Sequence, residues 1–359
     1  MGHRDLHGFF CFRIPKAMGV IFHGLFYDGL DYSAGDDWIL PEQIKIKESE
    51  KHMSAKRHEP IEVTAHLFQL GTPDFPAYLS MGEEGMIIEG GTGPTFPIMV
   101  NQIETLGIDP HKIKTIILTH THADHIGAVP HLQHRWPHLK LLASPIGAQL
   151  LGKKELFKEF QLCDLGIAQL MKARSEIDTL PAPVRNYAFA VDATVKEGDV
   201  IDLGGGIIWR VYETPGHAPC HISLFEEHEG TLAIGDAAGF YVPEQDLFWP
   251  NYFDSLDHYC NSIRKLAALP ATRAVLSHHG VVQGDTRQHL AKAMQATARY
   301  HHELMERLAK GEATETIAMD KARFVDSLTD IQPFKVMYAL CKVLIKNSQQ
   351  DGKGDHFVF

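Results

Sequence analysis

The densest group of chemically active side chains lies in residues 119–127, which read THTHADHIG. In an extended chain residues two apart point the same way, so His120, His122 and Asp124 are predicted to converge on one side. His125 has the opposite parity, and a helix that begins near Asp124 would turn it toward the others. Imidazole and carboxylate groups at this density are the ligand mix of zinc, iron or manganese sites. We therefore predict a metal site here.

The segments on either side of this cluster favour a metal site over a chance gathering. Chance has to be weighed because the chain contains 23 histidines, many of them single residues in polar stretches. Residues 114–119 form a short apolar run that is typical of a buried strand. Residues 126–135 fit a helix whose first turn contains Pro130. A strand and a helix would therefore hold the cluster between them.

Short strands separated by glycine and proline turns are predicted along most of the chain. The predicted strands are residues 61–70, 77–81, 85–89, 114–119, 139–143, 200–203, 207–213, 222–225, 232–234 and 273–276, the last of which ends the series. Helices are predicted over residues 94–106, 126–135, 146–174 (as one or two helices) and 254–269, and from residue 285 onward. This order predicts an α/β fold in which two mixed sheets pack face to face with helices outside, an αββα sandwich.

Three regions are predicted from the changes in patterning along the chain. Residues 1–55 lack sustained periodicity and are interpreted as an N-terminal extension, in which Met53 is an alternative start of the natural chain. Residues 56–285 form the predicted catalytic domain. Residues 286–359 carry apolar stripes at helical spacing and form a helical C-terminal region. Those helices would either cover the metal site or make a contact between two copies of the chain.

Composition restricts the classes of partner and the compartment. The formal net charge of -11 argues against nucleic-acid binding, which needs a basic face. No apolar run approaches the roughly 20 residues of a membrane span, and the start lacks the pattern of a secretory signal. The five cysteines are widely spaced, without a CxxC pair. These features predict a cytoplasmic protein that binds neither nucleic acid nor membrane.

The cluster also resembles a known family motif. The run HTHADHIGA is similar to the HxHxDH motif of the metallo-β-lactamase superfamily, and three further motifs follow in that family's order. These are TPGH at residues 214–217, IGD at residues 234–236 and SHHG at residues 277–280. The resemblance covers roughly residues 60–280 and implies a metal-dependent hydrolase with the αββα fold.

The resemblance implies a set of ligands for two metal ions. Carried over to this chain, the set is His120, His122, Asp124, His125, His217, Asp236 and one histidine of the last motif. In that set His120, His122 and His217 complete the first metal site, and Asp236 bridges both metals. The last ligand is either His278 or His279. We expect His279, because in many relatives the ligating histidine directly precedes a glycine.

Two residues near these motifs need separate interpretation. Glu89 stands where the family usually has an aspartate before a glycine. It could orient a ligating histidine through the second ring nitrogen, or have a capping or surface role. His221 follows His217 by four residues, and we expect it to be a hydrogen-bonded strand residue instead of a ligand.

The implied chemistry is hydrolysis of a small-molecule substrate. Two divalent ions, zinc by preference with iron or manganese as alternatives, would share a bridging hydroxide that attacks an ester, thioester or lactone carbonyl. Asp124 is expected to handle the proton during this attack. The alternatives are a mononuclear iron enzyme similar to persulfide dioxygenases, a β-lactam or phosphodiester hydrolase, and a metal-stabilised protein without activity.

Overall fold

The structure is a computed structural model that describes residues 58–359, apart from residues 183, 185–186, 330, 351–355 and 358–359. The predicted N-terminal extension, residues 1–55, and the alternative start Met53 lie outside the described residues. The described residues all belong to one compact unit, Glu50–Phe359.

One sheet contains seven strands in sequence order, from β1 to β7. Its strands are β1 (Ile61–Thr64), β2 (Leu67–Gly71), β3 (Pro76–Met81), β4 (Gly85–Ile88), β5 (Ile113–Ile117), β6 (Lys140–Ala143) and β7 (Val191–Thr194). The pairs from β1 to β4 are antiparallel, and the pairs from β4 to β7 are parallel. Parallel neighbours need long crossover connections. Here these are α2 (Phe96–Thr105), then α3 (Ala123–Ile126) with α4 (Val129–Arg135), and finally α5 (Pro145–Leu151) with α6 (Phe157–Ala173).

The second sheet contains six strands in the order β15-β14-β11-β10-β9-β8. Its strands are β8 (Val200–Asp202), β9 (Ile208–Glu213), β10 (Ile222–Glu226), β11 (Thr231–Gly235), β14 (Arg273–Leu276) and β15 (Val281–Gln283). Only β11 and β14 are parallel among these pairs. Between β11 and β14 the chain forms the hairpin β12 (Phe240–Val242) and β13 (Leu247–Trp249), followed by α7 (Leu256–Ala267).

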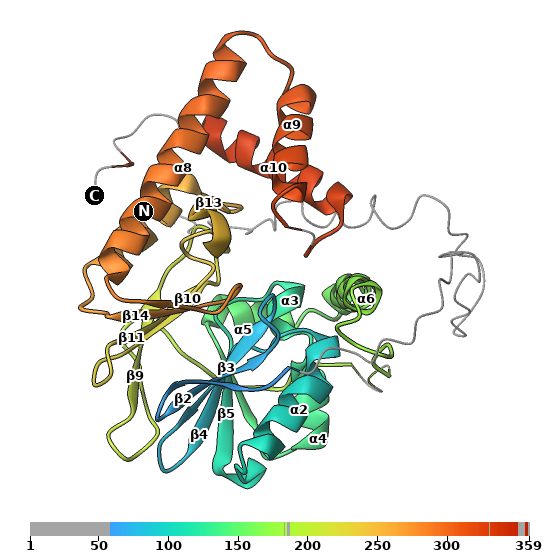
Figure 1. The fold of residues 1–359 in the computed structure, drawn as a ribbon, viewed down its shortest axis with the longest axis vertical. Coiled ribbons are helices and arrows are strands. Elements are labelled where there is room, and N and C mark those ends of the chain that lie inside the picture. Colours follow the sequence, from blue (N-terminus) through green and yellow to red (C-terminus); the bar gives the residue numbers. More distant parts are fainter. Residues whose placement is uncertain (1–57, 183, 185–186, 330, 351–355, 358–359) are drawn as a thin grey trace, which may run out of the picture. The chain divides into compact units, whose positions relative to one another are not determined.

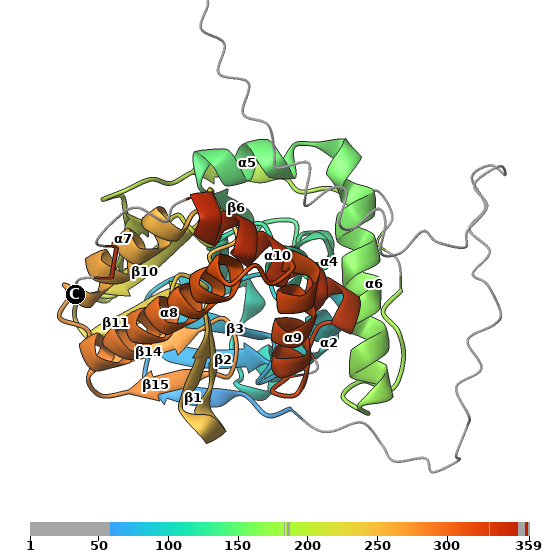
Figure 2. The same ribbon diagram turned by 90° about the horizontal axis from the view of Figure 1, so that it is seen from above.

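Two apolar cores explain why the sheets pack as they do. Side chains alternate along a strand, so a buried strand contributes to both of its faces. On β4, Met86 and Ile88 join a core shared with the second sheet, which supplies Trp209 and Leu224. Ile87 points the other way, into the core under the helices. Figure 1 shows α2 and α4 beside the first sheet, and Figure 2 shows α7 beside β10 of the second sheet. The predicted αββα sandwich is confirmed.

Helices follow the sandwich, as predicted from residue 285 onward. They are α8 (Thr286–Ala309), α9 (Thr314–Asp326) and α10 (Phe334–Gln350), drawn orange to red in Figure 1. Helices α9 and α10 pack against each other, and α8 packs against α7 and β13. Among the helices of the described residues, none is long and apolar enough to cross a membrane.

The strand prediction differs from the structure in three respects. Residues 61–70 form two strands, because Thr64 pairs with Leu67 across a tight turn. Residues 273–276 are not the last strand, since β15 pairs with β14 after the SHHG turn. Strands β7, β12 and β13 were also missed. Each has three or four residues, too few to show the alternation on which strand prediction depends.

Candidate metal centre

The predicted site residues follow the carboxyl ends of several strands. In α/β sheets these ends are the usual place for a site. Glu89 follows β4, the histidine cluster follows β5, and Asp236 directly follows β11. The two sheets are joined at this edge, where the backbone N–H of Ile222 donates to the carbonyl oxygen of Thr119 over 2.8 Å. Side chains from both sheets therefore meet at one place.

The histidine cluster itself changes from extended to helical within a few residues. His122 is extended, with φ -70° and ψ 151°, and is the N-cap of α3. The N–H of His125 donates to the carbonyl oxygen of His122 over 3.0 Å, which turns His125 toward the site. The predicted helical turn is confirmed. The predicted convergence holds for His120 and His122 alone, because Asp124 lies inside the helix and faces another group.

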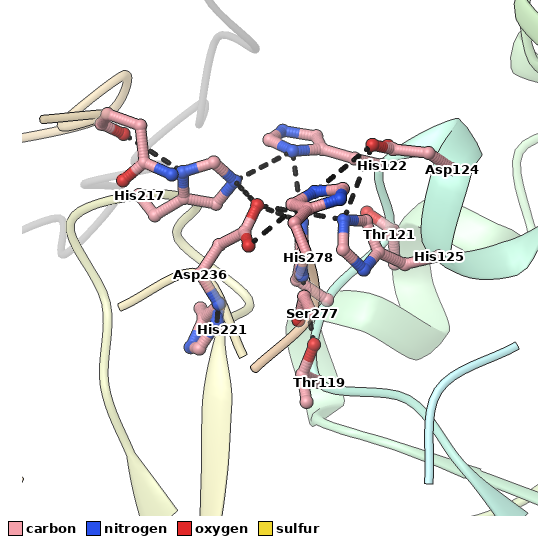
Figure 3. Close-up of polar contacts among 12 residues, drawn as sticks. Thr119, Thr121, His122, Asp124, His125, His217, His221, Asp236, Ser277 and His278 are labelled. Atoms are coloured by element: carbon pink, nitrogen blue, oxygen red, sulfur yellow. Dashed lines mark hydrogen bonds and ion pairs between the residues drawn. The ribbon is translucent and has the colours of Figure 1, made fainter. Parts of the chain in front are cut away.

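His120, His122 and His217 form the first group of potential ligands. The Nδ1 atom of His122 lies 3.0 Å from Nε2 of His120 and 2.9 Å from Nε2 of His217. His217 arrives through the TPGH turn, in which Gly216 has a φ of +124°. A Cβ atom at residue 216 would overlap the backbone of Tyr259 in α7. Glycine therefore lets this turn lie against α7, and Figure 3 shows the ring of His217 directed toward His122.

Asp124, His125 and His278 form the second group. The Oδ2 atom of Asp124 lies 3.6 Å from Nε2 of His125 and 3.6 Å from Nε2 of His278. The Nε2 atom of His125 is buried and has no hydrogen-bond partner among the described residues. A buried polar atom without a partner is costly, and a metal ion between these groups would satisfy it.

Asp236 lies between the two groups. Its Oδ2 atom is 3.3 Å from Nε2 of His217 in the first group and 3.6 Å from Nε2 of His125 in the second. Its Oδ1 atom is 3.9 Å from Nε2 of His278. Figure 3 shows the carboxylate of Asp236 facing both sets of rings. One carboxylate is thus within reach of both groups of ligands.

His278, and not the expected His279, lies beside the other predicted ligands. His278 faces the cluster, whereas Nδ1 of His279 lies 4.0 Å from Oδ1 of Asp74 on the opposite side. The reason lies in the turn after β14, where His279 has a φ of +62°. The hydroxyl of Tyr78 contacts the carbonyl oxygens on both sides of this turn, at Leu276 (2.6 Å) and Gly280 (2.9 Å).

Hydrogen bonds to the second ring nitrogens prepare the histidines for metal binding. Nδ1 of His217 donates to the carbonyl oxygen of Asn251 over 2.9 Å, and Nδ1 of His278 donates to that of Asp74 over 2.6 Å. A carbonyl oxygen can only accept, so in the neutral ring Nε2 carries a lone pair directed at the cluster. The roles of Asn251 and Asp74 could not be predicted from the sequence, because each accepts its hydrogen bond through the backbone carbonyl oxygen, which every residue type has.

Glu89 provides the same support for His125. The carboxylate is buried, and its Oε1 atom accepts hydrogen bonds from the hydroxyls of Thr119 (2.6 Å) and Ser277 (2.9 Å). Its Oε2 atom lies 3.3 Å from Nδ1 of His125. Of the two roles considered for Glu89, the structure supports the orienting one. Thr119 directly precedes the HxHxDH motif and Ser277 is the first residue of SHHG. Their positions beside the motif histidines could have indicated a role at the site.

The two groups differ in charge when no metal is bound. Burial, with help from neighbouring histidines, lowers the pKa of His120 and His217 well below the usual value. Burial likewise lowers the pKa of His122 to about 4. Burial also lowers the pKa of His125, but three carboxylates, Asp124 first among them, outweigh it and raise that pKa to about 10. The first group is therefore neutral at pH 7 and the second holds a proton.

These groups fit divalent metal ions. Three histidine lone pairs converge in the first group, while the second joins two imidazoles to a carboxylate. Mixed imidazole and carboxylate sets are typical of zinc, iron and manganese sites. The pKa of Asp124 is lowered: burial opposes ionisation, but His125 and His278 outweigh it, so the carboxylate is ionised at neutral pH.

Comparison with known proteins agrees with this geometry. The sequence model of the metallo-beta-lactamase superfamily matches residues 78–278. The chain is 28% identical over 207 residues to the probable metallo-hydrolase YflN of Bacillus subtilis, covering 55% of this chain and 75% of that protein. It is 25% identical over 186 residues to a hydroxyacylglutathione hydrolase of Methylobacterium nodulans, covering 50% of this chain and 53% of that one. The match thus spans only about half of the latter.

A solved structure with a similar fold can be superimposed on more of this chain than the sequence matches cover. The metallo-beta-lactamase family protein TTHA1429 from Thermus thermophilus superimposes with a TM-score of 0.56 and 22% identity. The superposition covers 81% of this chain and 95% of that one. At this identity the likeness concerns the fold alone.

Proposed function

Because the chain belongs to the metallo-beta-lactamase superfamily, we propose that it is a dinuclear metal-dependent hydrolase. The proposed substrate is a small molecule with an ester, thioester or lactone bond, and the proposed metal is zinc, with iron or manganese as alternatives. One observation carries the proposal: Asp236 lies between two complete groups of ligands, within 3.3 Å of His217 and 3.6 Å of His125.

The residues divide the chemical work. Two divalent ions held by these groups would lower the pKa of a water molecule to about 7 and polarise a carbonyl oxygen. Asp124 is ionised at neutral pH, and its side chain is 14% exposed compared with 8% for Asp236. It is the carboxylate better placed to take a proton from the attacking water. We therefore propose Asp124 as both a ligand and a catalytic residue.

Three observations support the substrate class. Relatives of the chain include a hydroxyacylglutathione hydrolase and a probable metallo-hydrolase. Next to the centre, the ring of Phe240 lies 5.4 Å from that of His278 and 4.8 Å from that of His279. This buried aromatic side chain gives the centre an apolar boundary on that side, which suits a substrate with an acyl group. The net charge of -11 favours a small molecule over a nucleic acid.

The structure also bears on the mononuclear alternative. An iron dioxygenase of the persulfide type would use His120, His217 and Asp236 and leave the second group unmetallated. The ligand atoms of Asp124, His125 and His278 all lie within 4.8 Å of one another, which instead supports occupation of both positions. No described feature favours the dioxygenase reaction specifically.

Metal analysis combined with a substrate panel tests the proposal. Wild-type protein should bind two zinc ions per chain and hydrolyse at least one member of a panel of thioesters, lactones and esters. His120→Ala should abolish this turnover. A matched change of an exposed histidine on α7, His258→Ala, should leave it intact.

Two results would overturn the proposal. One iron per chain with oxygen uptake would assign the dioxygenase reaction. Turnover that survives His120→Ala would place the active site elsewhere. β-Lactams and phosphodiesters belong in the same panel, because exclusive hydrolysis of either would replace the proposed substrate class.

A further inference from the structure

His221 lies beside the centre without belonging to either group of ligands. It is buried with 1% exposure, and its ring centroid lies 5.1 Å from that of His120. Both ring nitrogens are used by the protein. Nδ1 lies 2.8 Å from the hydroxyl oxygen of Thr214, and Nε2 lies 2.9 Å from the backbone nitrogen of Asp236. The predicted hydrogen bonding of His221 is confirmed, but the residue lies directly before β10 instead of within a strand. One of its partners is Asp236, the residue between the two groups.

Hydrogen bonds connect Asp236 to Ile234 through three side chains, those of His221, Thr214 and Ser223. The donor and acceptor of each bond follow from the groups at the two ends of this series. A peptide N–H can only donate, so Nε2 of His221 accepts from Asp236 and the ring proton is on Nδ1. That proton is donated to Thr214, whose hydroxyl then donates to Ser223 over 2.9 Å. Ser223 donates in turn to the carbonyl oxygen of Ile234 over 2.8 Å. The series thus begins at Asp236 and ends at Ile234, on both sides of Gly235.

Gly235 shows that this end of β11 is shaped around His221. The residue has a φ of +65°, and a Cβ atom there would overlap Nε2 of His221. The pairing of β11 with β14 is also irregular here, with a register shift between Ala233 and Gly235. Regular sheet pairing therefore does not set the backbone position of Asp236. The hydrogen bond that the backbone N–H of Asp236 donates to His221 holds the backbone there instead.

We propose that His221 is a positioning residue of the metal centre, which fixes the backbone of Asp236 so that its carboxylate stands between the two groups. Figure 3 shows His221 beneath Asp236, on the side away from the other labelled histidines. The inference rests on the proposed function, because it takes Asp236 as a metal ligand. His221 is itself no ligand, since neither ring nitrogen is free.

Titration of purified, metal-stripped protein with Zn²⁺ tests the proposal against a chelator of known affinity. His221→Phe keeps a ring of similar size but removes the acceptor for Asp236. It should weaken zinc binding roughly 10- to 100-fold, the usual effect of losing an outer-shell partner of a ligand. His221→Gln supplies an oxygen acceptor at the same reach and should restore most of that affinity. His289→Phe, a buried histidine outside the centre, is the matched control and should bind zinc like wild type.

A second pair of variants covers the case in which His221→Phe does not fold. Thr214→Val removes the partner that holds the ring proton on Nδ1, whereas Thr214→Ser keeps the hydroxyl. Zinc affinity should fall in the valine variant alone.

The outcomes separate this inference from the proposed function. If wild type binds two zinc ions and His221→Phe, or Thr214→Val in its place, binds them equally tightly, the positioning role is overturned while the proposed function stands. The positioning role is also overturned if His221→Gln is as weak as His221→Phe. Wild-type protein that binds none of zinc, iron and manganese would overturn the proposed function, and this inference with it.

Discussion

Nδ1 of His278 donates a hydrogen bond to the carbonyl oxygen of Asp74 over 2.6 Å. The carboxylate of the same Asp74 lies 3.1 Å from the guanidinium of Arg174, the C-cap residue of α6. One loop residue between β2 and β3 therefore links the inserted helix α6 to a predicted metal-binding ring. The helix that lies outside the recognised motifs is thereby connected to the centre.

Removal of Arg174 should loosen this link. Arg174→Ala leaves the Asp74 loop without its anchor, so zinc binding should weaken by roughly three- to tenfold, less than for a direct partner of a ligand. Arg174→Lys keeps the charge and should show a smaller loss. Arg210→Ala, which breaks an exposed pair with Glu227, is the control and should leave zinc affinity unchanged. Wild-type affinity in Arg174→Ala would show that α6 does not influence the centre.

The two neighbouring histidines of the SHHG motif should differ sharply. His278→Ala removes a ring that faces Asp124 and Asp236, so the protein should hold one zinc ion instead of two. His279→Ala removes a ring that faces Asp74 and Phe240, and zinc content should stay at two. Metal analysis after dialysis measures both. The reverse pattern would restore the assignment expected from the sequence.

Glu89 should matter for metal binding although it lies in the outer shell. Glu89→Gln removes the negative charge opposite His125 and replaces one of its acceptor oxygens by a donor. Zinc affinity should fall by roughly 10- to 100-fold. Ser277→Ala removes one of the two hydroxyl donors to the same carboxylate and should have a smaller effect. Glu84→Gln, on an exposed turn, serves as the control for the charge change.

The two metal positions should respond differently to pH. Without metal the pKa of His125 is raised to about 10, so below that pH a metal ion must displace its proton. Affinity at the second position should therefore rise by about tenfold per pH unit up to about pH 10. The first group needs no such displacement, because the pKa of His122 is lowered to about 4. Affinity at the first position should be nearly flat above about pH 5.

Calorimetry in buffers of different ionisation enthalpy counts the protons released. Near pH 7.5 the second zinc ion should release about one proton more than the first, because it displaces the proton of His125. Equal release from both positions would contradict the charge difference between the two groups. The His278→Ala variant, which should keep only the first position, provides a check on the assignment.

The sequence by itself determined the fold class and most members of the site. Spacing within residues 119–127 is local information, and a tight motif brings its side chains together whatever the rest of the chain does. The turns TPGH and IGD carry glycines whose backbone conformations, at Gly216 and Gly235, few other residues adopt. The order of strands and helices along the chain indicated two sheets with helices outside. Three of the short strands, β7, β12 and β13, were missed.

Only the tertiary structure shows which of His278 and His279 lies beside the other predicted ligands. The two residues are adjacent, and which of them faces the centre depends on how the turn after β14 is held. Tyr78 from the other sheet holds it by contacts to Leu276 and Gly280, nearly 200 positions away in sequence. The positioning role proposed for His221 likewise rests on a long-range contact, the hydrogen bond from the backbone N–H of Asp236, which directly follows β11. The local motifs identify which residues can be ligands. Long-range packing fixes the backbone conformation that determines whether their side chains face the centre.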